Sequence, residues 1–341
     1  MHKSLKVVLA SAIAVAGASS AALAGDALDA IKKRGELVCG VNTGLGGFAL
    51  PDSDGKYTGL DVDVCKAVAA AMFGDATKVK YVPLTAQQRF TALQSGEIDI
   101  LSRNTTWTLT RDTSLGLNFA GVSYYDGQGF MVPKKLGVSS AKELSGATIC
   151  VQPGTTTELN LADYFRANKM EFKPVVIEKL QDVNAAFFSG RCDVYTTDAS
   201  GLASIRKNDA PKGESENYVI LPEIISKEPL GPVVRHGDDQ LFDIVKWTLN
   251  ALIEAEEYGI TAANVDKMSK ESTNPGVQRL LGATPGMGKN LGLEETWAKN
   301  AIAAVGNYGE IWTRNIEPLG LPRGLNKLWN DGGIMYAAPV R

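Results

Sequence analysis

The sequence predicts an α/β protein that contains two doubly wound units and a helical C-terminal extension. The first observation is a β-α-β-α-β order of apolar runs and helical stretches over residues 36–103. The second is the return of this order, with similar spacing, over residues 130–198. In doubly wound sheets the ligand lies outside the carboxyl ends of the strands. Polar residues follow strands in both units, so we expect the two units to share one cleft.

Apolar runs and glycines set the expected bounds of the elements in the first unit. A short helix at 26–34 ends at Gly35, and a helix at 61–73 ends at Gly74, because glycine is a frequent C-terminal cap. The other elements are strands at 36–41, 78–84 and 98–101, a hairpin turn at 52–55 and a helix at 86–95.

The second unit and the extension follow the same pattern. Strands are expected at 130–132, 148–151, 175–178 and 192–196, and helices at 141–144, 156–168 and 182–188. Beyond them we expect a strand at 230–235, a helix at 241–257, and a helical extension from about Asp266 that includes helices at 294–305 and 308–314. Residues 334–341 form a tail for which the pattern predicts no place.

The first residues have the pattern of a secretory signal peptide. A basic start precedes an apolar run at 7–18, and Ala-Leu-Ala at 22–24 fits the small-residue rule for cleavage. We expect cleavage of residues 1–24, which leaves 317 of the 341 residues as a soluble, exported chain. A membrane anchor is disfavoured, because this run is short and no later run reaches ~18 apolar residues.

The composition excludes several classes of function. Hydrophobic residues make up 44% of the chain and charged residues 21%, as in an ordinary globular protein. The formal charge of −3 becomes −5 without the two signal-peptide lysines, so no nucleic-acid partner is expected. His236 is the one histidine beyond the signal peptide, which argues against a histidine-based triad or a multi-histidine metal site. We expect no metal and no cofactor.

Four cysteines in an exported chain favour disulfide bonds. The absence of a Cys-x-x-Cys pair disfavours zinc. Of the three possible pairings we favour Cys39–Cys65 with Cys150–Cys192, because each pair then falls within one unit. Four buried free thiols are the alternative.

The stretch IDILSRNTTWTLTR, residues 98–111, carries the main chemical signal. Hydroxyls and amides after a buried strand can present donors to a cleft, and an arginine such as Arg111 can bind a carboxylate with two parallel bonds. The alternative is a helix start capped by Thr108 or Thr110, with Arg111 in solvent. The stretch alone favours neither hypothesis.

The second unit offers a carboxylate opposite this cation. Asp198 follows the last strand of that unit, so Arg111 and Asp198 could hold the carboxylate and the ammonium group of an α-amino acid. The alternative for Asp198 is a helix N-cap before residues 199–206, and the spacing alone favours the cap.

Residues 98–111, SYYDGQGFMV at 123–132, QPGTTTE at 152–158 and YTTD at 195–198 together resemble the type II periplasmic solute-binding proteins of polar amino-acid ABC importers. The resemblance covers roughly residues 36–258. NPGVQRLLG at 274–282 and VGNYGEIWTRN at 305–315 resemble the subgroup that serves general L-amino-acid importers.

This resemblance implies roles for individual residues. Thr106 and Arg111 match the residues that bind the ligand carboxylate, and Asn104 matches the residue that joins them. Thr156 matches a threonine of the second lobe whose backbone contributes. Asp198 matches the aspartate that binds the ammonium group.

Further residues are implied by the same comparison. Arg89 stands where acidic-amino-acid binders carry an arginine for the ligand side chain, and otherwise it is a surface helix residue. Phe48 and Trp107 would line the pocket, and otherwise both belong to the core. Arg103 and Asn104 depart from the family pattern, because a small apolar residue or glycine is usual before the threonines.

The family topology implies two lobes joined by two crossing strands near 125–128 and 228–231. The first lobe would comprise residues 26–125 plus 231–341, and the second residues 126–230. A ligand would bridge the lobes, favour their closed arrangement, and be delivered to a membrane permease from the periplasm. We expect a monomer that is not an enzyme.

Two alternatives to transport are an enzyme and a sensor domain. An exported enzyme on the same fold, such as a cyclohexadienyl dehydratase acting on arogenate or prephenate, would need a general acid beside the leaving hydroxyl. The motif stretches offer no spare carboxylate for that task. A sensor ectodomain is disfavoured, because no transmembrane segment is predicted.

Overall fold

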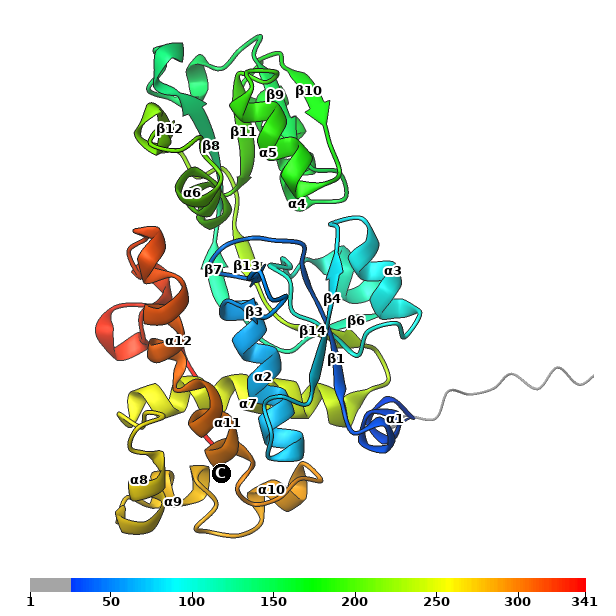
Figure 1. Cartoon of the computed structure of the whole chain (residues 1–341), viewed down its shortest axis with the longest axis vertical. Coiled ribbons are helices and arrows are strands. Elements are labelled where there is room, and N and C mark those ends of the chain that lie inside the picture. Colours follow the sequence, from blue (N-terminus) through cyan, green and yellow to red (C-terminus); the bar gives the residue numbers. More distant parts are fainter. Residues whose placement is uncertain (1–25) are drawn as a thin grey trace, which may run out of the picture.

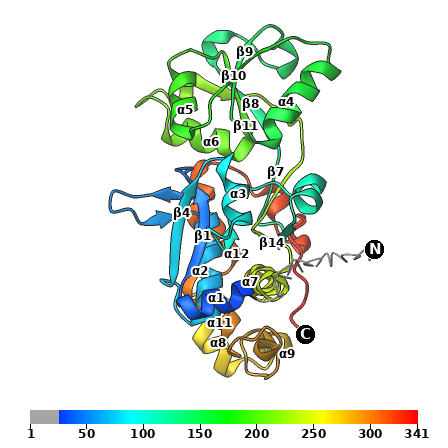
Figure 2. The same cartoon turned by 90° about the vertical axis from the view of Figure 1, so that its right-hand side faces the viewer.

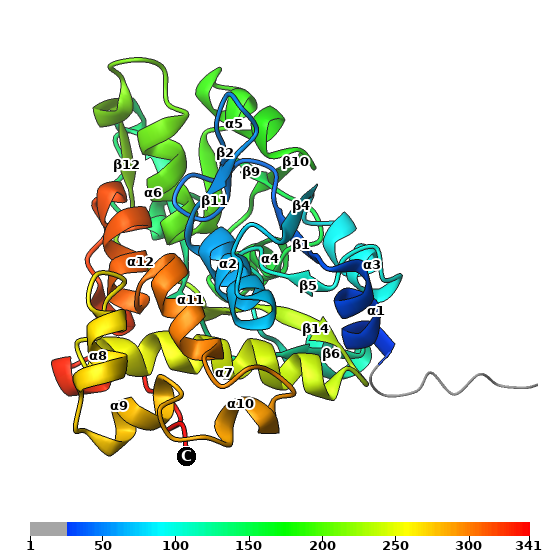
Figure 3. The ribbon, with the colours of Figure 1, turned by 60° about the horizontal axis from the view of Figure 1, so that its bottom comes forward.

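The computed structural model describes residues 26–341, so the predicted signal peptide lies outside the described residues. Two five-stranded sheets form the core of two units that lie one above the other (Figures 1 and 2). A set of helices from the C-terminal part of the chain covers one side of the lower unit (Figure 3). This arrangement confirms the predicted α/β class with a helical extension.

The first sheet has the strand order β4-β1-β5-β14-β6. Its strands are β1 (Leu37–Asn42), β4 (Val79–Leu84), β5 (Ile100–Leu101), β6 (Leu117–Phe119) and β14 (Val233–Arg235). Strand β1 pairs in parallel with β4 and β5, whereas β14 is antiparallel to β5 and β6. The carboxyl ends of β1, β4 and β5 therefore share one edge of the sheet, and this edge faces the second unit, because Thr85 directly after β4 donates to Glu178. Helices α1 (Asp26–Arg34), α2 (Leu60–Phe73) and α3 (Gln88–Gln94) belong to this unit, as does the small hairpin of β2 (Leu50–Pro51) and β3 (Tyr57–Thr58).

The second sheet has the order β10-β9-β11-β8-β12. Its strands are β8 (Gln128–Pro133), β9 (Thr148–Val151), β10 (Lys173–Val176), β11 (Val194–Asp198) and β12 (Tyr218–Ile220). The three central helices are α4 (Thr156–Ala167), α5 (Leu180–Phe188) and α6 (Ala199–Asn208). Strand β10 begins and ends two residues before the strand predicted at 175–178. Strand β11 begins and ends two residues after the strand predicted at 192–196.

Two short antiparallel strands, β7 (Tyr124–Asp126) and β13 (Glu228–Leu230), pass between the units. The single strand predicted at 230–235 is wrong, because the chain is divided here into β13 and β14. The reason is a close approach at Gly231, where an added Cβ would lie 1.9 Å from the carbonyl oxygen of Gly121. Pro232, which follows, has no backbone N–H to continue a ladder.

Each unit contains one disulfide bond. Cys39 is joined to Cys65 in the first unit, and Cys150 to Cys192 in the second. This is the pairing favoured from the sequence, and the structure contains no free cysteine among the described residues.

The helical extension begins after α7 (Asp239–Glu257) and packs against α2 and α7 through α11 (Trp297–Val305) and α12 (Tyr308–Asn315). It also contains α8 (Val265–Glu271), α9 (Pro275–Leu280) and α10 (Met287–Asn290). The C-terminal tail returns to α7, where the backbone N–H groups of Ala338 and Val340 donate to Asn250 and Glu254. Side chains on α7 therefore hold the tail that the sequence pattern left without a place.

The extension also contacts the crossing segment. The side-chain amide of Asn326 accepts a hydrogen bond from the N–H of Tyr125 (2.7 Å) and donates one to its carbonyl oxygen (3.0 Å). The hydroxyl of Tyr308 donates to the carbonyl oxygen of Ser123 at 2.8 Å. Lys207 of α6 donates to the carbonyl oxygen of Pro318, so the extension also touches the second unit. No helix within residues 26–341 is long and apolar enough to cross a bilayer.

Candidate functional site

Three buried arginines gather where the first unit faces the second. Arg89 lies on α3, Arg103 follows β5, and Arg111 lies in a single π-helical turn at Thr110–Ser114. Their exposed fractions are 3%, 3% and 7%, and none of them forms an ion pair with a carboxylate of the described chain. The alternative to ligand binding, which placed Arg89 and Arg111 on the surface, therefore does not describe the structure.

Backbone carbonyl groups supply the few hydrogen bonds that these arginines make. Arg111 Nη1 donates to Thr106 O at 2.9 Å, and Arg103 Nε donates to Leu84 O at 2.9 Å. Arg89 Nη2 reaches Gly154 O across the two units at 3.4 Å, whereas its Nε has no partner. Most guanidinium N–H groups therefore remain available to an anion.

The electrostatics of these cations suit the binding of an anion. Burial lowers the pKa values of Arg103 and Arg111 to about 10, so both stay charged at neutral pH. Burial and the neighbouring charges of Arg111 and Arg103 lower the pKa of Arg89 well below its usual value. The ring of Phe90 lies under the guanidinium groups of Arg89 and Arg111, with 4.8 and 4.9 Å from Cζ to the ring centroid. A bound carboxylate would offset the repulsion among the three cations.

Buried carboxylates lie beside the arginines, at the crossing strands and the start of α6. Asp198 occupies the N-cap position of α6, but its side chain makes no capping hydrogen bond. It instead accepts a hydrogen bond from Asn104 Nδ2 at 3.4 Å. Burial, together with the charges of Asp126 and Glu228, raises the pKa of Asp198 well above its usual value. The position at the helix start was predicted correctly, but the capping role was not.

Asp126 on β7 is a half-buried carboxylate near Asp198. It accepts hydrogen bonds from the N–H of Gly127 at 2.8 Å and from the hydroxyl of Ser200. Burial raises its pKa to about 6. A cation placed between Asp126 and Asp198 would stabilise both ionised forms.

Glu228 on β13 is a buried carboxylate that the sequence reasoning missed. Its Oε2 accepts hydrogen bonds from the hydroxyls of Thr106 (2.6 Å) and Thr156 (2.7 Å). Its Oε1 accepts from Asn160 Nδ2 (2.8 Å) and Ser226 Oγ (2.6 Å). A charged residue at the start of the apolar run PLGPVV, residues 229–234, is the one signal that could have indicated it.

Asn104 connects the two sets of charges. Its backbone N–H donates to Asp61 Oδ2 at 2.8 Å, and its side chain bridges Asn42 (3.0 Å) and Asp198. Its φ of 31° lies in the left-handed region, which asparagine tolerates better than most residues. This geometry gives a physical reason for an asparagine where the resembling family usually has a small residue or glycine. Burial raises the pKa of Asp61, which holds this loop, to about 6.

The two aromatic residues have different surroundings from those predicted for a pocket lining. Phe48 is fully buried and packs edge-on against Tyr124, with ring centroids 5.4 Å apart, so it belongs to the core. Trp107 is 41% exposed and stacks on Phe119 at 5.7 Å. Phe48 is therefore a core residue, which was the alternative to a pocket lining. Trp107 is too exposed for a core residue, and its ring stacks on Phe119.

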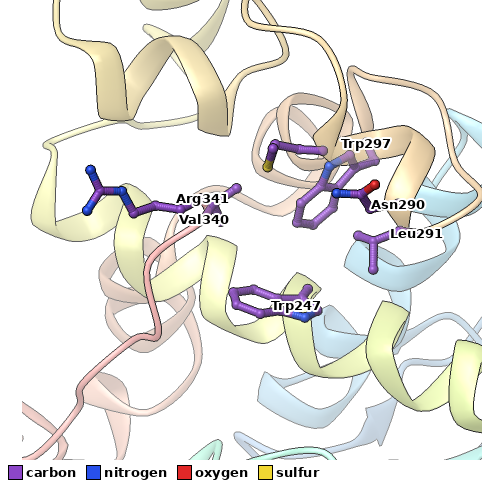
Figure 4. A pocket seen from close by; sticks show the side chains of 7 residues that line it. Trp247, Asn290, Leu291, Trp297, Val340 and Arg341 are labelled. Atoms are coloured by element: carbon purple, nitrogen blue, oxygen red, sulfur yellow. The ribbon is translucent and has the colours of Figure 1, made fainter.

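A separate cavity lies far from these charges, between α7, α10, α11 and the C-terminus (Figure 4). Its volume is about 140 Å³, and it is lined by Trp247, Met287, Asn290, Leu291, Trp297, Val340 and Arg341. It offers no carboxylate side chain, so it lacks the means to bind a zwitterion. Among residues 26–341 no group of His, Cys, Asp and Glu side chains could hold a metal ion.

The comparisons with known proteins agree with this geometry. Residues 37–263 match the model for bacterial extracellular solute-binding proteins, family 3. The chain is 61% identical to the general L-amino acid-binding periplasmic protein AapJ of Rhizobium johnstonii, over 100% of this chain and 99% of that protein. It is 59% identical to the glutamate/glutamine/aspartate/asparagine-binding protein BztA of Rhodobacter capsulatus, over 98% and 97% of the two chains.

A solved structure extends the likeness to three dimensions. An ABC transporter periplasmic binding protein from Brucella ovis, with glutathione bound, superposes with a TM-score of 0.90 at 59% identity. The match covers 93% of this chain and 100% of that one. It therefore includes the helical extension as well as both sheets.

The buried carboxylates predict how stability depends on pH. With a pKa of about 6, folded Asp126 holds its proton between pH 4 and 6, whereas the unfolded chain, with a value near 3.8, has released it. The free energy of unfolding of the ligand-free protein should therefore fall as pH rises through this window, by at most about 1.4 kcal/mol per pH unit and group. Urea unfolding at pH 5 and pH 7 measures the difference.

Substitution identifies the group responsible for this trend. Asp126→Asn should reduce the loss of stability between pH 5 and 7, and Asp182→Asn, on an exposed position of α5, should leave it unchanged. If the Asp126→Asn variant showed the same pH dependence of stability as the unaltered protein, Asp126 would not be the group that titrates in this pH window.

Proposed function

Because the chain belongs to the bacterial extracellular solute-binding proteins of family 3, we propose that it captures L-amino acids between its two lobes and delivers them to the permease of an ABC importer. Matches at 61% and 59% identity over nearly the full chain, to amino-acid-binding proteins, support this proposal. The proposed location is the periplasm, reached through a cleaved signal peptide, and the proposed state is a monomer.

One observation carries the choice of ligand. Three buried arginines without an ion pair lie on one side of the junction, and the buried carboxylates of Asp198 and Glu228, also without an ion pair, lie on the other. Buried charges are stable in proteins when they are paired. An α-amino acid carries a carboxylate and an ammonium group a few ångströms apart, so it can pair both sets at once.

The roles of individual residues follow from this placement. Arg111 binds the α-carboxylate, with help from the free backbone N–H groups at the start of α4 near Thr156. Asp198 binds the ammonium group, and Asn104 holds the two charges at a fixed separation. Thr106 lies between them, where its hydroxyl is 3.3 Å from that of Thr156.

Acidic amino acids have a further advantage at this site. The three guanidinium groups carry more positive charge than a single α-carboxylate can neutralise. One of them, that of Arg89, donates a hydrogen bond to the carbonyl oxygen of Gly154 in the second unit. A second carboxylate on the ligand side chain would pair Arg89. We therefore propose that the site accepts many L-amino acids and binds L-glutamate and L-aspartate most tightly.

The proposed lobes comprise residues 26–125 plus 231–341 and residues 126–230, with β7 and β13 as the hinge. Contacts between the two parts support ligand capture by closure: Thr85 Oγ1 donates to Glu178 at 2.7 Å, and Thr106 Oγ1 donates to Glu228 at 2.6 Å. A ligand that pairs charges in the closed form shifts the equilibrium only by its higher affinity for that form.

The enzyme alternative lacks support. Asp126 has a pKa of about 6, which would suit a general acid, but its oxygens already accept from Gly127 and Ser200. The closely similar relatives are binding proteins. Purified protein should therefore form no product from prephenate or arogenate.

A ligand panel tests the proposed function. Ligand-stripped protein should be stabilised by many L-amino acids, and a ligand at a hundred times its Kd adds about 2.7 kcal/mol. D-amino acids should give no shift, because a reversed α-carbon cannot place both charges and the side chain together. Thermal shifts with the twenty L-forms and their D-forms check this, and a panel without any L-specific shift would contradict the proposal.

The carboxylate assignment predicts the effect of a single substitution. Arg111→Ala should lower the affinity for L-glutamate at least a hundredfold, about 2.7 kcal/mol, because a buried bidentate partner of the carboxylate is lost. Calorimetric titration measures the affinity, and circular dichroism checks the fold. Arg166→Ala, whose side chain is 79% exposed on α4, is the matched control and should bind normally. Affinity within threefold of the unaltered protein would refute the role of Arg111.

A further inference from the structure

Glu228 is the most completely buried carboxylate at the junction, with 1% of its surface exposed. It accepts four hydrogen bonds, one from Thr106 of the first lobe, two from Thr156 and Asn160 of the second, and one from Ser226 beside the crossing strand. No Lys or Arg of the described chain pairs with it within 4 Å. Burying a carboxylate without an ion pair costs free energy, which these four hydrogen bonds offset in part.

The hydrogen bonds to Glu228 fix the direction of two hydroxyl groups. A threonine hydroxyl has one proton to donate and two lone pairs to accept with. An ionised carboxylate only accepts, so the protons of Thr106 and Thr156 both point to Oε2 of Glu228 (2.6 and 2.7 Å). The hydroxyl oxygens can then only accept hydrogen bonds from a ligand.

We propose that Glu228 is a specificity-determining residue that presents the hydroxyl oxygens of Thr106 and Thr156 as acceptors and supplies negative charge, so that both recognise the ammonium group of the ligand. This inference rests on the proposed function. It revises the role that the family resemblance implies for the Thr106 hydroxyl, which was carboxylate binding. The carboxylate is then left to the guanidinium and backbone N–H donors.

The charge pattern around Glu228 supports this direction. Glu228 adds to the negative field at Asp198 and Asp126, which together form an acidic group at the crossing strands and α6. A ligand carboxylate placed against the Thr106 and Thr156 hydroxyls would face this group and would find no free hydroxyl proton. An ammonium group in the same place gains the two hydroxyl oxygens as acceptors, and the negative charge of the acidic group offsets the cost of its burial.

A pair of ligands separates this role from a structural one. L-glutamate and L-2-hydroxyglutarate differ only in the charged ammonium group, which a neutral hydroxyl replaces. Glu228→Gln keeps the size of the side chain and an oxygen that accepts from both threonines, but it removes the charge. The variant should lose at least tenfold in affinity for L-glutamate and less than threefold for L-2-hydroxyglutarate, as measured by calorimetry.

A matched control and the opposite outcomes make this experiment decisive. Glu223→Gln alters another carboxylate that accepts a hydroxyl, that of Ser140, but both residues belong to the second unit and lie outside the acidic group, so it should change neither affinity beyond threefold. Equal losses for both ligands in Glu228→Gln would reduce Glu228 to a structural role. Tighter glutamate binding in the variant would overturn the inference in the opposite direction. Failure of the unaltered protein to bind any amino acid would instead refute the proposed function.

A measurement on the unaltered protein covers the case in which Glu228→Gln fails to fold. In a crystal structure with L-glutamate, the ligand nitrogen should lie within ~3.2 Å of Thr106 Oγ1 or Thr156 Oγ1. A ligand carboxylate oxygen in that place would overturn the inference.

Discussion

The junction between the lobes depends on buried charges that lack partners within the chain. Arg89, Arg103 and Arg111 lie on one side, and Asp198 with Glu228 on the other, and neither set forms an ion pair. Burial of unpaired charge costs free energy, which the packing and hydrogen bonds of both lobes must offset. A zwitterionic ligand removes much of that cost, and it does so only when the lobes face each other. Ligand binding and closure are thereby linked by one electrostatic constraint.

The crossing strands position these charges. Strand β13 carries Glu228, and the stretch from Thr105 to Trp107 runs beside it through backbone hydrogen bonds at 2.8–3.0 Å. On the other crossing strand, Tyr125 is held by Asn326 of the extension, whose amide satisfies both of its backbone groups. The extension thus supports the hinge from outside, while Glu228 connects the two lobes from within.

The sequence predicted the parts of the site that depend on local pattern. Arg111 and Asp198 could be found because each follows a recognisable strand, and the repeated β-α-β-α-β order placed both at strand ends. Glu228 could not be found, because its four partners come from residues 106, 156, 160 and 226, which only the folded chain brings together. The division of the strand predicted at 230–235 into two strands could not be predicted for a similar reason, because it depends on the contact of Gly231 with Gly121.

The account stands on the claim that the site needs both charges of an α-amino acid. The most direct measurement compares, by calorimetry, the affinity of ligand-stripped protein for L-glutamate, for 4-aminobutyrate, which lacks the α-carboxylate, and for glutarate, which lacks the ammonium group. The account predicts that each analogue binds at least a hundredfold more weakly than L-glutamate, about 2.7 kcal/mol. Affinity for either analogue equal to that for L-glutamate would contradict it, because one set of buried charges would then have no part in recognition.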